Sequence, residues 1–154
     1  AGTPSGTSPT TVAPPATEEQ IEKLEDATGV SLPAPYRAFL LAHNGGVPER
    51  RRFDTRDDKV SSLVTRFAAI SSDLEDNLQD EIEGITQAGQ IPNNLIPIAT
   101  DPAENRVVLS VAGPDAGSVY YWSWDEEPRR PTGSYKYMRL IAGDFDEFLS
   151  LLKP

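Results

Sequence analysis

Residues 32–46 read Leu-Pro-Ala-Pro-Tyr-Arg-Ala-Phe-Leu-Leu-Ala-His-Asn-Gly-Gly, a short apolar stretch that predicts one helix with both of its ends marked. Proline suits the first turn of a helix, where no backbone N–H has to be paired. The residues Asn44-Gly45-Gly46 tolerate the left-handed backbone that ends many helices. We therefore expect a helix from about Ala34 to His43, after which the chain turns sharply into a strand or a binding loop.

Two capping boxes predict the first and the last helix of the chain. The Thr17 hydroxyl and the Gln20 amide can each pair a free backbone N–H at the start of the first helix, and Gly29 is placed to end it. Asp144 and Glu147 repeat this pattern before an apolar run that closes the chain.

A further helix is predicted between residues 72 and 89. Ser72 or Asp73 can cap its start and Gly89 can end it. Its apolar residues recur at helical spacing, at Leu74, Leu78, Ile82 and Ile85.

The remaining apolar segments predict strands at residues 62–70, 96–99, 106–111, 118–124 and 137–142. The third and fourth of these are separated by a short Gly- and Pro-containing loop, which predicts a hairpin. Pro97 cannot donate to an interior ladder, so residues 96–99 should form an edge or starting strand. Residues 47–59 are dominated by charge and are expected to form an exposed loop. No alternating βαβ rhythm appears, which favours an α+β fold, an antiparallel sheet with helices packed to one side.

The chain length of 154 residues suits a single domain with a short tail. Residues 1–16 carry no charge and few large apolar side chains, so we expect them to be a flexible tail before a domain at residues 17–154. No segment reaches the ~20 apolar residues of a membrane span, and there is no cysteine. These features lead us to expect a soluble, cytoplasmic protein.

The net charge of −10 is unevenly distributed. Between Phe67 and Asn105 there is no Lys or Arg, but there are eight acids: Asp73, Glu75, Asp76, Asp80, Glu81, Glu83, Asp101 and Glu104. Such a field repels phosphate backbones and attracts cationic proteins, which argues against direct nucleic-acid binding and for a basic protein partner. Solubility alone is the alternative explanation.

The strand Val119 to Trp124 carries an aromatic row. Alternation along a strand sends Val119 and Tyr121 to one face and Tyr120, Trp122 and Trp124 to the other. The second face is either covered by the core or exposed as a binding platform with an acidic rim. The candidate partner-binding residues are Glu75, Asp76, Asp80, Glu83, Asp101, Glu104, Tyr120, Trp122, Trp124, Asp125 and Glu126.

The sequence offers little support for catalysis, a metal or a cofactor. His43 is the only histidine, and its place at the end of a helix favours a capping role over a catalytic one. The acids of residues 73–83 lack the alternating ligands and central glycine of a calcium loop. Asp101 to Asn105 could hold a cation weakly, but side chains in such loops more often form Asx turns. We therefore predict no metal, no cofactor and no enzymatic activity, although a small carboxylate-dependent hydrolase stays an alternative on composition.

Taken in order, several short signals resemble the SUKH superfamily over about residues 17–152. They are the helix ending at Gly29, Leu32-Pro33 with Tyr36, Phe39-Leu40, Asn44-Gly45-Gly46, Ile96 to Ala99 followed by Asp101 and Asn105, Val119 to Trp122, and Phe145 to Leu149. The superfamily contains bacterial immunity proteins and fungal regulators of cell-wall synthesis.

The resemblance implies a curved, mainly antiparallel sheet with several helices and a non-enzymatic binding protein. The implied function is an immunity protein that neutralises a secreted toxin, often a nuclease, by direct association. An intracellular adaptor or regulator is the alternative. One departure is local, since Asp101-Pro102-Ala103-Glu104 stands where the family usually has a glycine-containing turn.

Overall fold

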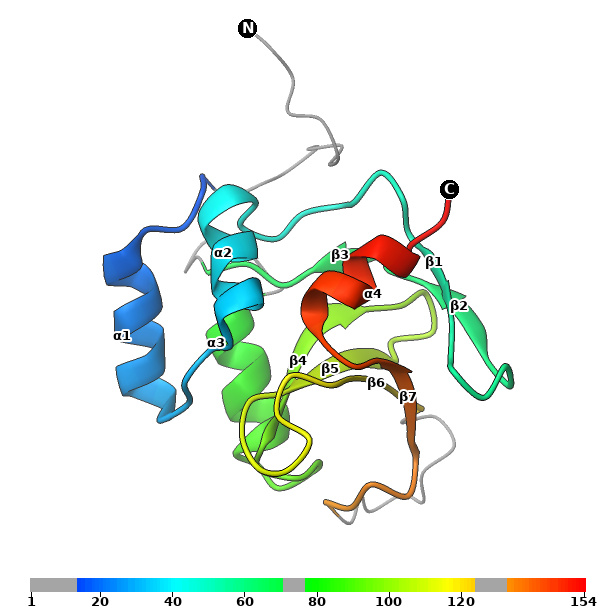
Figure 1. The fold of residues 1–154 in the computed structure, drawn as a ribbon. Coiled ribbons are helices and arrows are strands. Elements are labelled where there is room, and N and C mark those ends of the chain that lie inside the picture. The colour runs from blue at the N-terminus through cyan, green and yellow to red at the C-terminus, as the bar shows by residue number, and fades with distance from the viewer. Residues whose placement is uncertain (1–13, 71–76, 124–132) are drawn as a thin grey trace, which may run out of the picture.

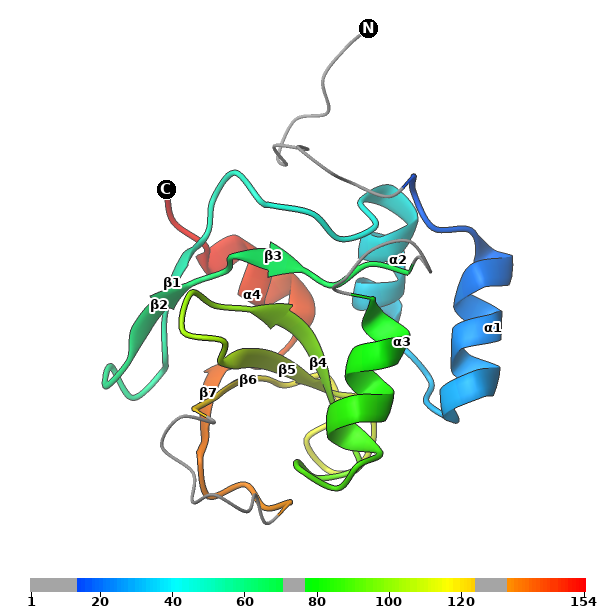
Figure 2. The ribbon, with the colours of Figure 1, turned by 180° about the vertical axis from the view of Figure 1, so that it is seen from behind.

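The computed structural model describes residues 14–70, 77–123 and 133–154. Figure 1 shows helices in front of and beside a central sheet, and Figure 2 shows the same fold from behind. The elements in chain order are α1 (Glu18–Thr28), α2 (Ala34–Ala42), β1 (Arg52–Asp54), β2 (Ser61–Leu63), β3 (Arg66–Phe67), α3 (Leu78–Glu81), the π-helix η1 (Ile82–Thr86), β4 (Leu95–Thr100), β5 (Arg106–Ser110), β6 (Val119–Trp122), β7 (Met138–Ala142) and α4 (Phe145–Leu151).

Both ends of α1 follow the predicted pattern. Thr17 accepts a hydrogen bond from the Gln20 N–H, and the Gln20 side chain accepts one from the Thr17 N–H. Gly29 ends the helix with a left-handed backbone, at φ 74°. In α4 the Asp144 side chain accepts from the Glu147 N–H, but the Glu147 carboxylate pairs with the N–H of Gly143 instead of Asp144. The second capping box is therefore only half formed.

The exit from α2 differs from the prediction. The helix ends at Ala42, and His43 caps it with an extended backbone at φ −141°. The left-handed residues are Gly45 and Gly46, at φ 79° and 93°. The sharp turn thus begins three residues beyond the helix, at Gly45, where the chain passes close to Ala68 and Ala69.

Asn44 ties this turn to two distant segments. Its side-chain N–H groups lie 3.0 Å from the carbonyl oxygens of Pro14 and Ile70, and its oxygen accepts from the Ile70 N–H at 2.8 Å. The side chain is buried. Asn44 therefore has a structural role that its position in the Asn-Gly-Gly run did not reveal.

The predicted boundary of the tail at residue 16 needs correction. Ala16 is buried in the main core, and its N–H donates to the Leu40 carbonyl at 3.0 Å. Pro14 accepts from Asn44 as described above. Residues 14–16 thus belong to the packed domain, and residues 1–13 lie outside the described part of the chain.

Two truncations should separate these segments. Removing residues 1–13 is expected to leave the melting temperature within about 2 °C of the parent, whereas removing residues 1–16 should lower it by about 4–8 °C. The larger change follows from the loss of two hydrogen bonds worth about 1 kcal/mol each. Differential scanning calorimetry of both variants tests this. Equal melting temperatures would show that the contacts of Ala16 contribute nothing.

The helix predicted over residues 72–89 is shorter and changes its pitch. Asn77 caps the start of α3, accepting from the Gln79 N–H at 2.9 Å, so this helix begins at Leu78, whereas the predicted caps were Ser72 and Asp73. Those two residues lie outside the described segments, as does Leu74. The predicted apolar face is otherwise present, since Leu78, Ile82 and Ile85 are buried.

The main sheet is an antiparallel meander in the order β3-β4-β5-β6-β7. The predicted hairpin is confirmed by the pairing of β5 with β6. β3 pairs with β4 only at Ala99 and Thr100, so Pro97 lies where β4 has no partner strand on that side. A register shift between Pro97 and Ala99 marks a bulge at this point. The α+β class is thus confirmed, with an antiparallel sheet.

Two of the sequence-based predictions for residues 47–70 were wrong. Residues 47–59 are not all loop, because β1 pairs with β2 in a separate two-stranded sheet that buries Phe53 and Thr55. Residues 62–70 are not one strand, since they are divided between β2 and β3 in different sheets. A single buried ring among many charges is too weak a pattern to reveal the strand.

Two hydrophobic clusters hold the sheet from its two faces. The main core joins α1, α2 and α4 to the sheet. In it, the centroid of the Phe145 ring lies 5.1 Å from the ring centroids of Tyr36 and of Phe39. A smaller cluster on the other face contains Ile85, Ile91, Leu95, Val108 and Trp122. No helix in the described segments is both long and apolar enough to cross a membrane.

Candidate partner-binding surface

The α3–η1 helix presents carboxylates away from its buried face. Asp80 and Glu83 are exposed, and Glu81 is partly buried on the flank that faces β5. Because a helix turns about 100° per residue, burial of Leu78 and Ile82 directs Asp80 and Glu83 to solvent. Neither of these two forms an ion pair within the described part of the chain, although Glu83 accepts a hydrogen bond from Gln79.

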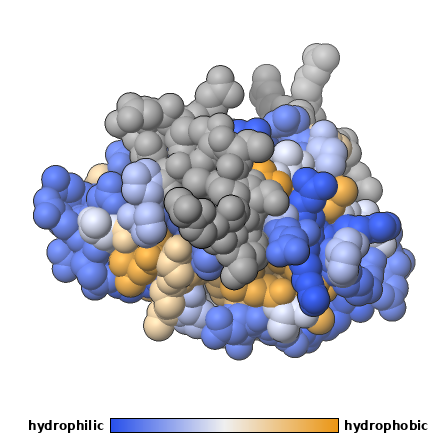
Figure 3. All heavy atoms as spheres, turned by 90° about the horizontal axis from the view of Figure 1, so that it is seen from above, coloured by the Kyte–Doolittle hydropathy of each residue, from blue (hydrophilic) through white to orange (hydrophobic). Residues whose placement is uncertain are grey.

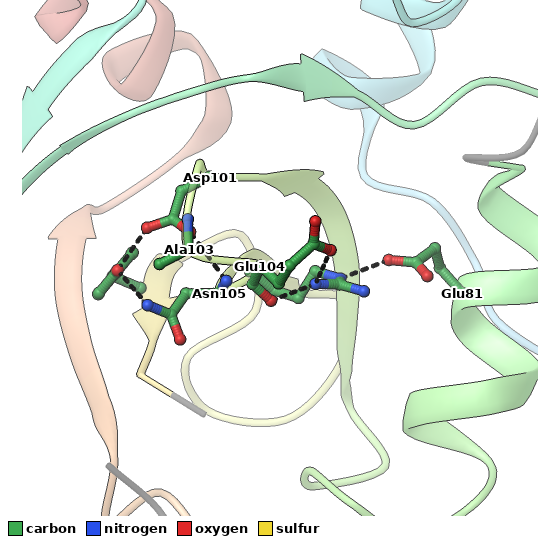
Figure 4. Close-up of polar contacts among 7 residues, drawn as sticks. Glu81, Asp101, Ala103, Glu104 and Asn105 are labelled. Carbon is green, nitrogen blue, oxygen red and sulfur yellow. Dashed lines mark hydrogen bonds and ion pairs between the residues drawn. The ribbon is translucent and has the colours of Figure 1, made fainter. Parts of the chain in front are cut away.

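Asp101 builds the turn between β4 and β5 (Figure 4). One of its carboxylate oxygens accepts from the backbone N–H groups of Ala103 and Asn105, at 2.9 and 2.8 Å. The other accepts from Ser62 Oγ at 2.8 Å and from the Tyr121 hydroxyl at 2.6 Å. Asp101 is only 4% exposed. Its assignment as a direct partner contact is therefore corrected: it forms an Asx-type turn, the other possibility raised by the sequence.

The phenol of Tyr121 completes the same network from β6. Asn105 donates its side-chain N–H to the Tyr121 oxygen at 2.7 Å, while Tyr121 donates to Asp101. Burial raises the pKa of Tyr121, and the hydrogen bond to Asp101 raises it further, so the phenol stays a donor at neutral pH. Sequence analysis missed the roles of Ser62 and Tyr121, because they lie far from Asp101 along the chain.

Glu104 occupies the strained position of this turn. Its backbone is left-handed at φ 67°, a conformation that favours glycine, while its side chain is 74% exposed. This is the turn that departs from the family's usual glycine-containing pattern. At this strained position Glu104 supplies an exposed carboxylate, which a glycine would not supply.

Glu104→Gly is expected to raise the free energy of unfolding by about 0.5–1 kcal/mol, because glycine adopts the left-handed region without steric cost. Chemical denaturation of the parent and the variant measures the difference. Glu104→Ala is the matched control, since it removes the same carboxylate but keeps the Cβ. Equal effects of the two changes would contradict the expectation by assigning the gain to the lost charge.

Arg106 contacts two acidic residues, Glu81 and Glu104, which are both labelled in Figure 4. Its Nε donates to Glu81 Oε1 at 2.6 Å, and its Nη1 donates to the Glu104 backbone carbonyl. The Glu104 carboxylate is farther away, at 3.9 Å from Nη1. The acidic segment is therefore partly neutralised by the first residue beyond it. Asp80, Glu81, Glu83 and Glu104, with Arg106 between Glu81 and Glu104, form what we call the acidic surface.

Trp122 is largely covered. Its side chain is 3% exposed and packs in the smaller cluster with Ile85 and Ile91. Of the two possibilities for this face of the strand, the structure shows the buried one at Trp122. The residue offers a partner little surface of its own, and its prediction as a large exposed anchor is corrected accordingly.

Tyr120 is held in place by a second polar cluster. Its hydroxyl donates to Asp115 at 2.7 Å, and the Tyr135 hydroxyl donates to the same oxygen at 2.8 Å. Partial burial and the Asp115 carboxylate raise the pKa of Tyr120 to about 12. Partial burial acts to raise the pKa of Asp115. The hydrogen bonds from Tyr120, Tyr135 and Ser110 outweigh this effect, so the pKa of Asp115 is lowered overall.

The structure brings part of the predicted set together. Asp80, Glu83 and Glu104 are exposed on the acidic surface. Tyr120 lies half-buried on the strand next to β5. The remaining predicted site residues lie outside the described segments and stay predictions: Glu75, Asp76, Trp124, Asp125 and Glu126.

Besides a cleft of about 440 Å³ at the β1–β2 sheet, two clefts lined by described residues open on the surface. One of about 340 Å³ lies at the acidic surface and is lined by Ile85, Gln90, Glu104, Arg106 and Trp122. The other, of about 270 Å³, is mainly apolar and is lined by Phe39, His43, Pro48, Glu49, Arg50, Phe67, Leu149 and Leu152. On the coloured part of the face seen from above, hydrophobic patches lie among mostly hydrophilic residues (Figure 3). Of these clefts, only the one at the acidic surface is lined by described residues that were predicted to bind a partner.

The described residues show no arrangement suited to a metal. Within residues 14–70, 77–123 and 133–154, no three side chains of His, Cys, Asp or Glu are grouped to hold an ion. His43 caps α2 through its backbone N–H, and its ring lies 6.0 Å from that of Phe39. What the acidic surface can do chemically is to bind cations of another molecule by charge.

Comparison with known proteins gives two matches. The model of the SMI1/KNR4 family (SUKH-1) matches residues 15–151. A protein of Bacillus subtilis (strain 168), described as SPbeta prophage-derived uncharacterized protein YokK, is 28% identical over 152 residues, covering 86% of this chain and 72% of that protein. The family match spans nearly all of the described fold, including the acidic surface.

Proposed function

Because the chain belongs to the SMI1/KNR4 family (SUKH-1), we propose that it is a non-enzymatic protein-binding domain, and specifically an immunity protein that neutralises a cognate toxin. The toxin domain would be basic, with a nuclease as the expectation by family analogy, and would be bound directly in the cytoplasm without a cofactor. A similar protein carried by a bacterial prophage favours this role over the fungal type of cell-wall regulation. An intracellular adaptor with another partner is the rival.

The acidic surface is the observation that carries the proposal. Asp80 and Glu83 are exposed, without ion pairs in the described residues, on a helix whose other face is buried in the core. Glu104 projects from the neighbouring turn, 74% exposed. Fixed carboxylates of one sign attract a basic partner and accelerate its encounter.

Side-chain hydrogen bonds and an ion pair also hold the backbone segments that carry the acidic surface. The Asp101 network holds the turn that carries Glu104, and Arg106 joins this turn to Glu81 on α3. A surface whose backbone is held in place loses less conformational entropy when it binds. The arrangement therefore supports rapid association followed by a long-lived complex.

The double variant Asp80→Asn, Glu83→Gln should slow association with the cognate toxin domain about tenfold at low salt, because exposed charges act mainly on the association rate. The dissociation rate should change less than about threefold. Stopped-flow or surface-plasmon kinetics at 20 and 300 mM salt measure both rates. High salt should remove most of the difference, since screening shortens the range of exposed charges to below ~10 Å.

Glu49→Gln with Asp146→Asn is the matched control. These two carboxylates are also exposed, carry the same charge, and lie on the loop after α2 and on α4. If both double variants slowed association equally, the effect would come from the net charge of the protein and not from the position of the acidic surface.

The proposed function itself is tested by co-expression. The toxin domain encoded beside this chain's gene should arrest growth of a bacterial host, and co-expression of the chain should restore it and yield a complex on size-exclusion chromatography. A toxin from an unrelated gene pair is the control. Failure to bind the neighbouring toxin, or turnover of a substrate by the chain alone, would contradict the proposal.

A further inference from the structure

The cleft at the acidic surface combines apolar and charged groups in one space. Its lining comes from η1, the segment after it, the β4–β5 turn, β5 and β6. We propose that this cleft is a socket for a single arginine side chain of the protein partner. The inference rests on the proposed function, because it names the chemistry by which that partner is anchored.

The charges of the cleft favour a cation. Arg106 is compensated internally, since Glu81 holds its Nε at 2.6 Å and both side chains are at most 20% exposed. Glu104 is different, because its carboxylate is 74% exposed and no closer than 3.9 Å to Arg106. Arg106, Glu81 and Glu104 together carry one net negative charge, because Glu81 neutralises Arg106. The charge that remains is that of the exposed Glu104 carboxylate. An incoming guanidinium can pair with Glu104 without displacing Arg106 from Glu81.

The apolar part of the lining suits the stem of a long side chain. Ile85 and Trp122 line the cleft but are only 8% and 3% exposed, so they offer the stem a narrow apolar strip on a firmly packed wall. Arginine buries its methylene groups along apolar surface while its head stays polar. Its planar guanidinium also packs against aromatic rings and pairs with carboxylates through two hydrogen bonds, which a lysine ammonium cannot do.

The backbone around the socket is fixed before any partner arrives. Glu104 lies within the turn that Asp101 closes with hydrogen bonds of 2.9 and 2.8 Å. On the opposite side, the Gln90 side chain donates to the Gly84 carbonyl at 2.8 Å and its N–H donates to the Ile85 carbonyl at 3.0 Å. A socket with both walls held in place binds a side chain at a lower entropic cost.

The test uses short peptides, so it does not depend on knowing the toxin. The probes are acetyl-Gly-Ser-X-Ser-Gly-amide with X as Arg, Lys or Ala, titrated into the isotope-labelled protein and followed by NMR. The Arg peptide should shift the Ile85 methyl, the Gln90 side-chain amide and the Trp122 indole N–H saturably. The Lys peptide should do so more weakly and the Ala peptide not at all. Trp124→Phe leaves Trp122 as the single tryptophan and assigns its signal.

Two variants locate the binding energy. Glu104→Gln should weaken binding of the Arg peptide about tenfold, the effect of losing one charge-assisted hydrogen bond. Glu83→Gln makes the same change of charge outside the cleft and should weaken it less than about twofold. Melting curves of both variants confirm that the fold is kept. Equal effects of the two variants, or equal shifts by the Arg and Ala peptides, would overturn the socket.

The socket and the proposed function can fail separately. A toxin complex that forms normally with Glu104→Gln would overturn the socket and leave the immunity role standing. Binding of the Arg peptide at the three named signals, with no complex to the neighbouring toxin, would support the socket and overturn the immunity role.

Discussion

Gly45→Ala is expected to lower the free energy of unfolding by about 2–4 kcal/mol. A left-handed backbone costs about 1 kcal/mol for a residue with a Cβ, and Gly45 has φ 79°. The added Cβ would also stand 2.7 Å from the Ala69 Cβ and 3.0 Å from the Ala68 carbonyl oxygen. Overpacking of this kind costs a further ~1–3 kcal/mol. Urea denaturation followed by circular dichroism measures the loss.

Gly29→Ala is the matched control for this prediction. Gly29 has nearly the same backbone, at φ 74°, but an added Cβ would meet nothing within 4 Å. Its replacement should therefore cost only the conformational part, about 1 kcal/mol. If both variants lost the same free energy, the close approach of Gly45 to the Ala68–Ala69 segment would have no energetic weight.

Asp101→Ala is expected to destabilise the protein by about 3–5 kcal/mol, because hydrogen bonds to a charged group contribute about 1.5–3 kcal/mol each and buried donors are left unpaired. The carboxylate accepts from two backbone N–H groups, from Ser62 and from Tyr121, at 2.6–2.9 Å. The turn that carries Glu104 should loosen at the same time. Amide hydrogen exchange at Ala103 and Asn105 would report this local opening.

Asp101→Asn separates the turn from the side-chain network. An asparagine keeps one oxygen for the two backbone N–H groups, and its amide can donate to the hydroxyl oxygens of Ser62 and Tyr121. The loss should then fall to about 1–2 kcal/mol, with the protection of the turn largely retained. A loss as large as that of Asp101→Ala, with the turn opened, would show that the negative charge itself holds this site together.

The exposed acids of α3–η1 were predictable from the sequence. Leu78, Ile82 and Ile85 recur at helical spacing, and that period alone places Asp80 and Glu83 on the outer face. The π-helical end was not predictable, because the wider turn depends on how Ile85 and Thr86 pack against neighbouring segments. Thr86, for example, donates its hydroxyl to the Leu95 carbonyl at 2.7 Å.

Other candidate residues were misjudged because their surroundings come from elsewhere in the chain. The sequence correctly placed Trp122 on the face of its strand that is opposite to the face of Val119. The residues that bury Trp122, among them Ile85 and Ile91, come from elsewhere in the chain. A count of charges between Phe67 and Asn105 could not show that Arg106 pairs with Glu81, 25 positions away. The cleft that these contacts create is visible only in three dimensions.

Local sequence signals are sufficient to predict the helix starts at Thr17 and Asp144, the α1 exit at Gly29, and the β5–β6 hairpin. These are local features, in which a cap, a glycine or a short loop acts within a few residues of its partner. The burial of Asp101 beneath its turn and the accessibility of the Glu104 charge follow instead from long-range packing. Burial and ion pairing depend on segments brought together by folding, and the contacts of Asp101 with Ser62 and Tyr121 span 39 and 20 positions of the chain.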